Sequence, residues 1–206
     1  MIPALVTAGA TRNPVDAIRY LSAGATGSTG LALARALAST HDVVLLGSAE
    51  ACLRAGSSVA SEEFGSTRDL MARMQAHLRS RPGGVLVHSA AVGDYEAEAL
   101  ATKIPSGQPE LVIRLRPGPK IVDHVRTWDP GVFLVSFKAG SPEWSDDKLV
   151  EVATAQCART RSDLVFANRL GDLDRSCAIV AASGVERFAS RDRALSRLVE
   201  RIRLRA

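Results

Sequence analysis

The stretch that decides the fold is VTAGATRNPVDAIRYLSAGATGSTG, from Val6 to Gly30. It follows an apolar segment at residues 2–6 and leads into LALARALAST at 31–40, whose spacing predicts a helix. A glycine-rich turn between a strand and a helix directs backbone N–H groups and the positive end of the helix toward an anion, most often a phosphate. A dinucleotide-binding turn needs one glycine cluster. This stretch holds two, Gly9 and then Gly24, Gly27 and Gly30.

Length and composition predict a globular protein. With 206 residues, of which 46% are hydrophobic and 23% charged, the chain fits a single domain over residues 1–206. Its apolar runs are shorter than the roughly 20 residues that span a bilayer, and MIPALV predicts a first strand rather than a signal peptide. The three cysteines, Cys52, Cys157 and Cys177, are widely spaced. We therefore expect reduced thiols and a cytoplasmic protein without a membrane partner.

The formal net charge of +4 raises the question of nucleic-acid binding. Six arginines fall in the last sixteen residues, where they alternate with apolar side chains. This pattern predicts an amphipathic terminal helix with a solvated basic face. Few aromatic side chains are available for base stacking, so we expect no nucleic-acid partner. A modest positive field suits small anionic substrates.

Apolar runs alternate with helical patterns along the chain. We expect strands at residues 2–6, 43–47, 84–92, 111–116, 132–137 and 163–168, and helices at 31–40, 66–80, 119–128 and 146–160. CAIVAA and ERFA indicate a hairpin before the last helix. This order predicts an α/β fold with a doubly wound, mainly parallel sheet (Rossmann-like), helices on both faces and a C-terminal β-hairpin. The polar loop at residues 95–109 is predicted to be a mobile flap.

Ligands in such folds bind beyond the carboxyl ends of the strands. Asp94, Lys120 and Lys138 fall at element ends on that edge, and Lys103 lies in the flap. Three lysines that converge with glycine turns form a cage for a triphosphate, or for a phosphate and a carboxylate. The alternative is that the lysines are solvated, that Asp94 caps a turn and that His88 is a core histidine.

GATGSTG at 24–30 also matches the G-x-x-G-x-x-G turn of short-chain dehydrogenases. Such a turn should follow directly on a strand, and an acidic residue should follow the second strand. Neither is found, and a Tyr-x-x-x-Lys pair is absent. A nicotinamide enzyme is a distant alternative, as is a purely structural glycine turn.

Several segments resemble a known family. VTAGATRNPVDAIRYLS resembles the signature T-[AS]-G-x-T-x-x-x-[IL]-D-x-[VI]-R-x-[IL]-[ST] of phosphopantothenate–cysteine ligases, also called phosphopantothenoylcysteine synthetases. VLVHSAAVGDY, KIPSG, PKIVDHVRTWDPGVFLVSFK and DKLVEVATAQCARTRSDLVFAN are similar to the family's later blocks, so the resemblance covers residues 2–205. The PK and FK forms resemble its stand-alone streptococcal and eukaryotic branch.

The resemblance implies a nucleotide-dependent ligase of coenzyme A biosynthesis. Family members activate 4′-phosphopantothenate with CTP or ATP and Mg²⁺, form an acyl-nucleotide, and join it to cysteine. They are homodimers in which the partner completes each site. The substrates expected here are therefore a phosphopantothenate-like acid and a cysteine-like amine.

The resemblance also assigns site residues by motif. Nucleotide-binding positions are Gly9, Gly27, Ser28, Gly30, Ala90, Asp94, Lys103, Pro119, Lys120, Ile121 and Phe137, with Arg159 or Arg161 as a further cation. Substrate-binding positions are Arg19, Ser22, Thr26 and Asn168. The catalytic positions are Lys103, Lys120, Lys138 and Ala23, and metal ligands are left unassigned.

Ala23 is the departure from the family pattern. The family has Asn at this position, where it handles the acyl-nucleotide, and alanine has no side chain that hydrogen-bonds. One hypothesis is a ligase in which Ser22, Thr26 or Ser28 replaces the Asn. A second is a divergent homologue that activates another carboxylate or joins another amine. A third is a non-catalytic nucleotide-binding paralogue.

Overall fold

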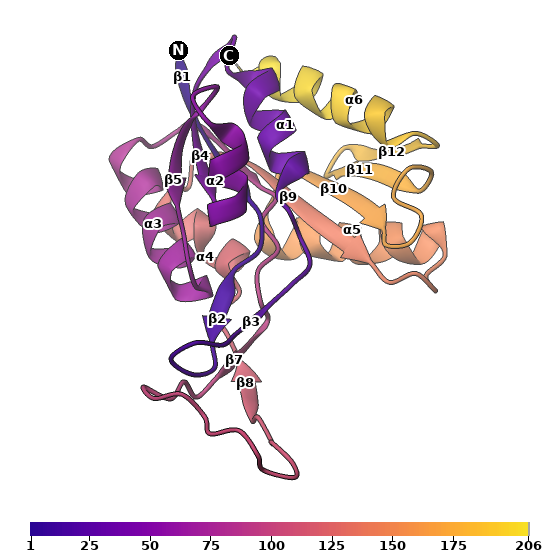
Figure 1. Cartoon of the computed structure of the whole chain (residues 1–206). Coiled ribbons are helices and arrows are strands. Elements are labelled where there is room, and N and C mark those ends of the chain that lie inside the picture. Colours follow the sequence, from indigo (N-terminus) through magenta and orange to yellow (C-terminus); the bar gives the residue numbers. More distant parts are fainter. Residues whose placement is uncertain (206) are drawn as a thin grey trace.

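A computed structural model describes residues 1–205, and Ala206, the last residue of the predicted single domain, lies outside this range. Its centre is an eight-stranded sheet in the order β12-β11-β10-β9-β6-β1-β4-β5 (Figure 1). The strands are β1 (Ile2–Ala8), β4 (His41–Gly47), β5 (Ala60–Glu63), β6 (Val85–His88), β9 (Phe133–Gly140), β10 (Leu164–Arg169), β11 (Cys177–Ala181) and β12 (Gly184–Phe188). β11 pairs antiparallel with both β10 and β12, and all other neighbouring strands pair parallel, which confirms the predicted fold class and the C-terminal hairpin.

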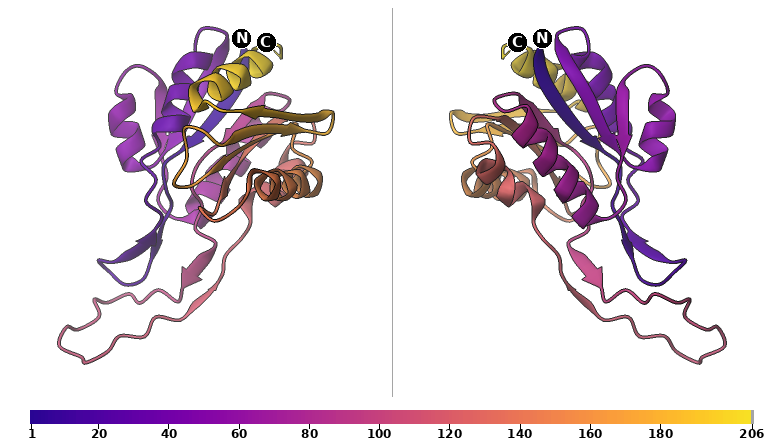
Figure 2. Two further views of the ribbon diagram at one scale, coloured as in Figure 1. Left: turned by 90° about the vertical axis from the view of Figure 1, so that its right-hand side faces the viewer. Right: turned by 90° about the vertical axis from the view of Figure 1, so that its left-hand side faces the viewer.

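Helices cover both faces of the sheet, as Figures 1 and 2 show. One face carries α1 (Ser28–Leu37), α2 (Ala49–Ala55) and α6 (Arg191–Arg203), and the other carries α3 (Thr67–Ser80), α4 (Ile121–Trp128) and α5 (Asp146–Thr160). Successive side chains of a strand point to opposite faces, so Val6 of β1 packs in the first layer and Leu5 in the second. Burial on both sides explains the uninterrupted apolar strands. No helix within residues 1–205 is long and apolar enough to cross a membrane.

The helices begin in two different ways. α2, α3, α5 and α6 start after serines, Ser48, Ser66, Ser145 and Ser190, whose side chains accept a backbone N–H of the first turn. α1 starts after Gly27, which has a φ of 81° and provides no side-chain cap, and its first turn has no acidic residue. The N-terminus of α1 therefore keeps its positive end and its N–H groups available for an external anion.

Two projections extend beyond the edge at which the parallel strands end, the carboxyl edge (Figures 1 and 2). One is the hairpin of β2 (Arg12–Pro14) and β3 (Tyr20–Ser22). The other, called the arm below, spans residues 95–117 and is closed at its base by β7 (Tyr95–Ala97) and β8 (Leu115–Pro117). The arm contains the predicted flap and extends eight residues further than residue 109, and its mobility stays a prediction.

The expected strand at residues 111–116 is wrong for most of its length. Only residues 115–117 pair, with β7, and residues 111–114 form no strand and are exposed. Within residues 1–205, the alternation in LVIRLR has no sheet face to pack against. Most other predicted elements differ from the observed ones by a few residues at their ends; α1, for example, begins at Ser28 rather than at residue 31. Helix α5 covers residues 146–160 as predicted. Helix α2, strand β5 and the β2–β3 hairpin were not predicted from the sequence.

Candidate functional site

The two glycine clusters meet in one corner of the molecule. Gly9 follows β1 with a φ of 90°, and Gly27 precedes α1 with a φ of 81°. A Cβ on Gly27 would lie 2.8 Å from the backbone nitrogen of Gly9, and a Cβ on Gly30 would lie 2.7 Å from the Cβ of Ala8. By contrast, Gly24 has no atom within 4 Å of its Cβ position. We call Gly9, Gly27 and Gly30 with the start of α1 the glycine corner; Gly24 does not contribute to its packing.

A cleft of about 430 Å³ opens beside this corner. It lies at the carboxyl edge, between the ends of β6, β9 and β10 and the start of α4. Nine of the predicted site residues line it: Ala90, Asp94, Pro119, Lys120, Ile121, Phe137, Lys138, Arg159 and Asn168. Thr29, in the first turn of α1, joins the cleft to the glycine corner. Residues from five separate predicted elements therefore converge on one opening.

The charged side chains at the cleft contact partners that a bound anion could displace. Lys120 Nζ donates to Asp94 Oδ1 at 2.6 Å, and both side chains are more than half exposed. Arg159 pairs with Asp123, and Lys138 Nζ lies 5.9 Å from the ring centroid of Trp144. Exposed ion pairs contribute only ~0–1 kcal/mol each, so a phosphate can displace these partners at little cost.

Several predicted residues lie outside the cleft. Lys103 is exposed on the arm, and Arg19, Ser22, Ala23 and Thr26 lie in the β2–β3 hairpin and its connection to α1. Ala23 is exposed there, and the described contacts of Ser22 and Thr26 are local, to Ala23 and Ser28. Within a single chain the structure does not bring these residues to the cleft.

Arg161, predicted as an alternative to Arg159, lies outside the cleft of its own chain. It lies beyond the end of α5 with a φ of 51°, its side chain is exposed, and it is absent from the cleft lining. Its carbonyl accepts hydrogen bonds from the Arg126 guanidinium at 2.6 and 3.0 Å.

The residues that anchor the arm to the hairpin were not among the predicted site residues. Backbone N–H groups of Ile104, Ile18 and Arg19 donate to the Asp16 carboxylate at 3.0, 2.9 and 2.8 Å. These bonds, foremost the one from Ile104, and the Arg19 guanidinium hold the pKa of the Asp16 carboxyl well below its usual range. Ile104 follows Lys103, so Asp16 fixes the backbone next to the predicted catalytic lysine.

A buried amide supports the same junction. Asn13 Nδ2 donates to the Tyr95 carbonyl at 3.1 Å, and Asn13 Oδ1 accepts the Thr67 N–H at 2.9 Å. The side chain therefore ties the base of the arm to the first residue of α3. Its place in the first motif was the available signal, but its partners are more than fifty residues away in sequence.

His88 is a buried residue that also lines the cleft. Its Nδ1 lies 2.9 Å from Thr7 Oγ1, and burial lowers its pKa to about 4. The imidazole is therefore neutral near pH 7. Thr7 Oγ1 in turn accepts the Ala90 N–H at 3.1 Å, so the pair shapes the backbone that lines the cleft.

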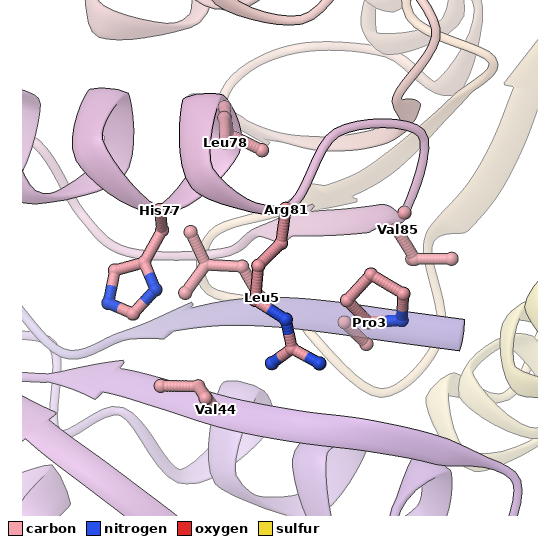
Figure 3. A pocket seen from close by; sticks show the side chains of 9 residues that line it. Pro3, Leu5, Val44, His77, Leu78, Arg81 and Val85 are labelled. Carbon is pink, nitrogen blue, oxygen red and sulfur yellow. The ribbon is translucent and has the colours of Figure 1, made fainter. Parts of the chain in front are cut away.

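A second hollow lies at the other end of the sheet, under α3 (Figure 3). Pro3, Leu5, Val44, His77, Leu78, Arg81 and Val85 surround it. His77 pairs with Glu62 and Arg81 with Asp42, so both polar groups are already satisfied. Its volume of about 20 Å³ holds little more than one water molecule, which excludes a substrate.

The sheet order, the glycine corner and the adjoining cleft define a doubly wound α/β protein whose first βα connection is built to receive an anion. The model of the family described as "DNA/pantothenate metabolism flavoprotein C-terminal domain" matches residues 2–187. The chain belongs to this family.

Named relatives agree with this assignment. The chain is 39% identical over 172 residues to the coenzyme A biosynthesis bifunctional protein CoaBC of Thermococcus kodakarensis, covering 81% of this chain and 41% of that protein. It is 32% identical to CoaBC of Mycolicibacterium smegmatis, covering 83% and 43%. The chain thus spans about two fifths of the length of these curated relatives.

Solved structures show the same fold. The DNA/pantothenate metabolism flavoprotein from Streptococcus pneumoniae has a TM-score of 0.87 at 24% identity, with full coverage of both chains. A Cab2 mutant in complex with phosphopantothenate-cysteine has a TM-score of 0.79 at 17% identity, covering 98% of this chain and 86% of that chain.

Proposed function

We propose that this chain is a nucleotide-dependent ligase that joins 4′-phosphopantothenate to cysteine in coenzyme A biosynthesis. The observation that carries the proposal is the cleft, which Lys120 and Lys138 line together with Thr29 of the first turn of α1. The family assignment and the likeness to CoaBC proteins support it. A cytoplasmic location, argued from the cysteine pattern, is part of the proposal.

The reaction would proceed in two steps. The substrate carboxylate attacks the α-phosphorus of CTP or ATP, which releases pyrophosphate and leaves an acyl-nucleotide. The cysteine amine then attacks the acyl carbon, which forms the amide and releases the nucleoside monophosphate. Negative charge develops on the phosphoryl oxygens in the first step. The cations Lys120, Lys138 and Arg159, which line the cleft, and the N–H groups of the glycine corner would stabilise it.

Magnesium fits this donor set. The described residues hold no group of three or more His, Cys, Asp or Glu side chains arranged for a metal, and Asp94 is the one carboxylate among the described cleft-lining residues. Mg²⁺ commonly binds through one or two carboxylates and the phosphates of a substrate. Asp94 would hold it here, and the bound ion would neutralise charge on the nucleotide phosphates.

We further infer a homodimer that completes each site. Both projections expose apolar side chains, including Ile18 at 62% and Val112 at 70% exposure, with Tyr20, Leu111 and Leu115 nearby in sequence. An apolar surface of this kind on two extended elements indicates a protein interface. A second copy would cover these side chains and bring the Lys103-bearing arm toward a cleft.

Ala23 favours a second candidate function. The family Asn is replaced by a side chain without donors or acceptors, while the glycine corner and the cleft lysines are kept. A divergent homologue that activates a different carboxylate, or joins a different amine, would have this combination. CTP and ATP stand as alternatives in both cases.

One experiment tests both candidates. Purified protein is incubated with CTP or ATP, Mg²⁺, 4′-phosphopantothenate and cysteine, and pyrophosphate and amide product are quantified. We expect both products in equal amounts. Pyrophosphate exchange that needs a different acid would favour the second candidate. Nucleotide binding without turnover over a panel of acids and amines would contradict both and favour a non-catalytic paralogue.

A further inference from the structure

Arg191 lines the cleft but belongs to none of the motifs described above. It is the first residue of α6, and its side chain reaches the first turn of α1, where Nη2 donates to Thr29 Oγ1 at 2.9 Å. Its guanidinium carbon lies 5.5 Å from the ring centroid of Phe166, which packs against Phe137 in the cleft wall. Two contacts therefore hold the guanidinium in place at the cleft.

The charge of Arg191 has no counter-ion in the part of the chain that the structure describes. Its Nη1 atom is buried and makes no hydrogen bond there, and none of the ion pairs among residues 1–205 includes it. Arg197 and Arg201 on the same helix both pair with Glu186. The Cys177 thiol contacts the Arg191 guanidinium but brings no negative charge, because burial, the largest influence on it, raises its pKa.

The N-terminus of α1 lies next to the Arg191 guanidinium. It has neither a capping side chain nor an acidic residue in its first turn, and Thr29 joins it to Arg191. A guanidinium that is partly desolvated and unpaired costs free energy, and an incoming anion removes that cost. An uncapped helix N-terminus adds N–H donors and a positive dipole.

We propose that Arg191 and the first turn of α1 bind a phosphoryl group of the ligand that occupies the cleft. The inference deepens the proposed function, since both the nucleotide and 4′-phosphopantothenate bring phosphoryl groups. It does not depend on turnover. Arg191 acts as a binding residue for oxyanions, and it enters the site from the C-terminal helix.

The test compares Arg191→Met with Arg193→Met, which removes an exposed arginine from the same first turn. Binding constants are measured by calorimetry for CTP, cytidine, 4′-phosphopantothenate and pantothenate. A lost charge-assisted hydrogen bond weakens binding by about 10- to 100-fold. We expect Arg191→Met to weaken one phosphorylated ligand by that factor and to leave its unphosphorylated counterpart unchanged. The affected pair identifies the source of the phosphoryl group.

A readout independent of activity separates this inference from the ligase proposal. Inorganic pyrophosphate should raise the melting temperature of the wild-type protein and of Arg193→Met, and should have little effect on Arg191→Met. If no amide forms with any nucleotide but this pattern holds, the ligase proposal fails and the oxyanion site stands. Wild-type affinity of Arg191→Met for all four ligands, or an equal loss in Arg193→Met, would overturn the inference. A less stable Arg191→Met with normal ligand binding would assign the residue a structural role.

Discussion

Replacing Gly9 by alanine tests the argument that the glycine corner depends on close backbone packing. Gly9 has a φ of 90°, and an added Cβ would lie 2.0 Å from Ser48 Oγ and 2.6 Å from Ser48 Cβ. Ser48 is buried and caps α2, with Oγ accepting the Ala51 N–H at 3.4 Å. The new methyl group therefore disturbs the backbone of the first turn and the start of a helix together.

The magnitude follows from three costs. A non-glycine residue in the left-handed region costs about 1–2 kcal/mol. Displacing the Ser48 side chain loses an N-cap of about 1 kcal/mol. Forcing a methyl group into a packed site costs about 1–3 kcal/mol, and the Ser48 Cβ cannot move without its backbone. We expect Gly9→Ala to lower the free energy of unfolding by about 3–6 kcal/mol, which for this chain length lowers the melting temperature by about 6–24 °C.

The assay is urea-induced unfolding followed by far-ultraviolet circular dichroism, with Gly24→Ala as the matched control. Gly24 lies in the same glycine-rich stretch, but its φ is not positive and no atom lies within 4 Å of its Cβ position. The control should be as stable as wild type or more stable by up to about 1 kcal/mol. Equal stability of Gly9→Ala and wild type, or an equal loss in both variants, would refute the packing argument.

Three further predictions concern the hairpin, the arm and the core. Ala23→Asn should raise the rate of amide formation by roughly 10²-fold if the family's positioned amide is what is missing, whereas Ala25→Asn in the same connection should leave it unchanged. Asp16→Asn should expose residues 98–114 to faster limited proteolysis at neutral pH, because the amide lacks the negative charge that strengthens the hydrogen bond from the Ile104 N–H. In the wild-type protein the same loosening should begin only as the pH falls below about 4, since the pKa of the Asp16 carboxyl is lower in the folded chain than in the unfolded one. His88 takes up a proton more readily in the unfolded chain than in the folded one, so the free energy of unfolding should fall by up to about 3 kcal/mol between pH 6.5 and pH 4. His88→Asn should reduce this pH dependence in urea unfolding, and an unchanged pH dependence would contradict the assigned burial effect.

Local patterns were enough to predict most of the regular structure. Helix α5 covers residues 146–160 as expected, because Leu149, Ala153 and Cys157 repeat at helical spacing on its buried face. The strand predicted at residues 111–116 was mostly wrong, because alternation of apolar and polar residues does not by itself supply a neighbouring strand to pair with. The missed α2 follows its N-cap Ser48 and has only seven residues, too few to establish a period.

The sequence by itself determined the alternation of strands and helices, the glycines of the first turn and the lysines at the carboxyl edge, because each depends on the conformation of a few adjacent residues. The tertiary structure decided which of them meet. It joined Gly9 to Gly27, separated Arg161 from Arg159, and placed Arg191 on Thr29 across 162 positions of sequence. Such contacts depend on how the helices pack on the sheet, and a local sequence pattern does not predict that packing.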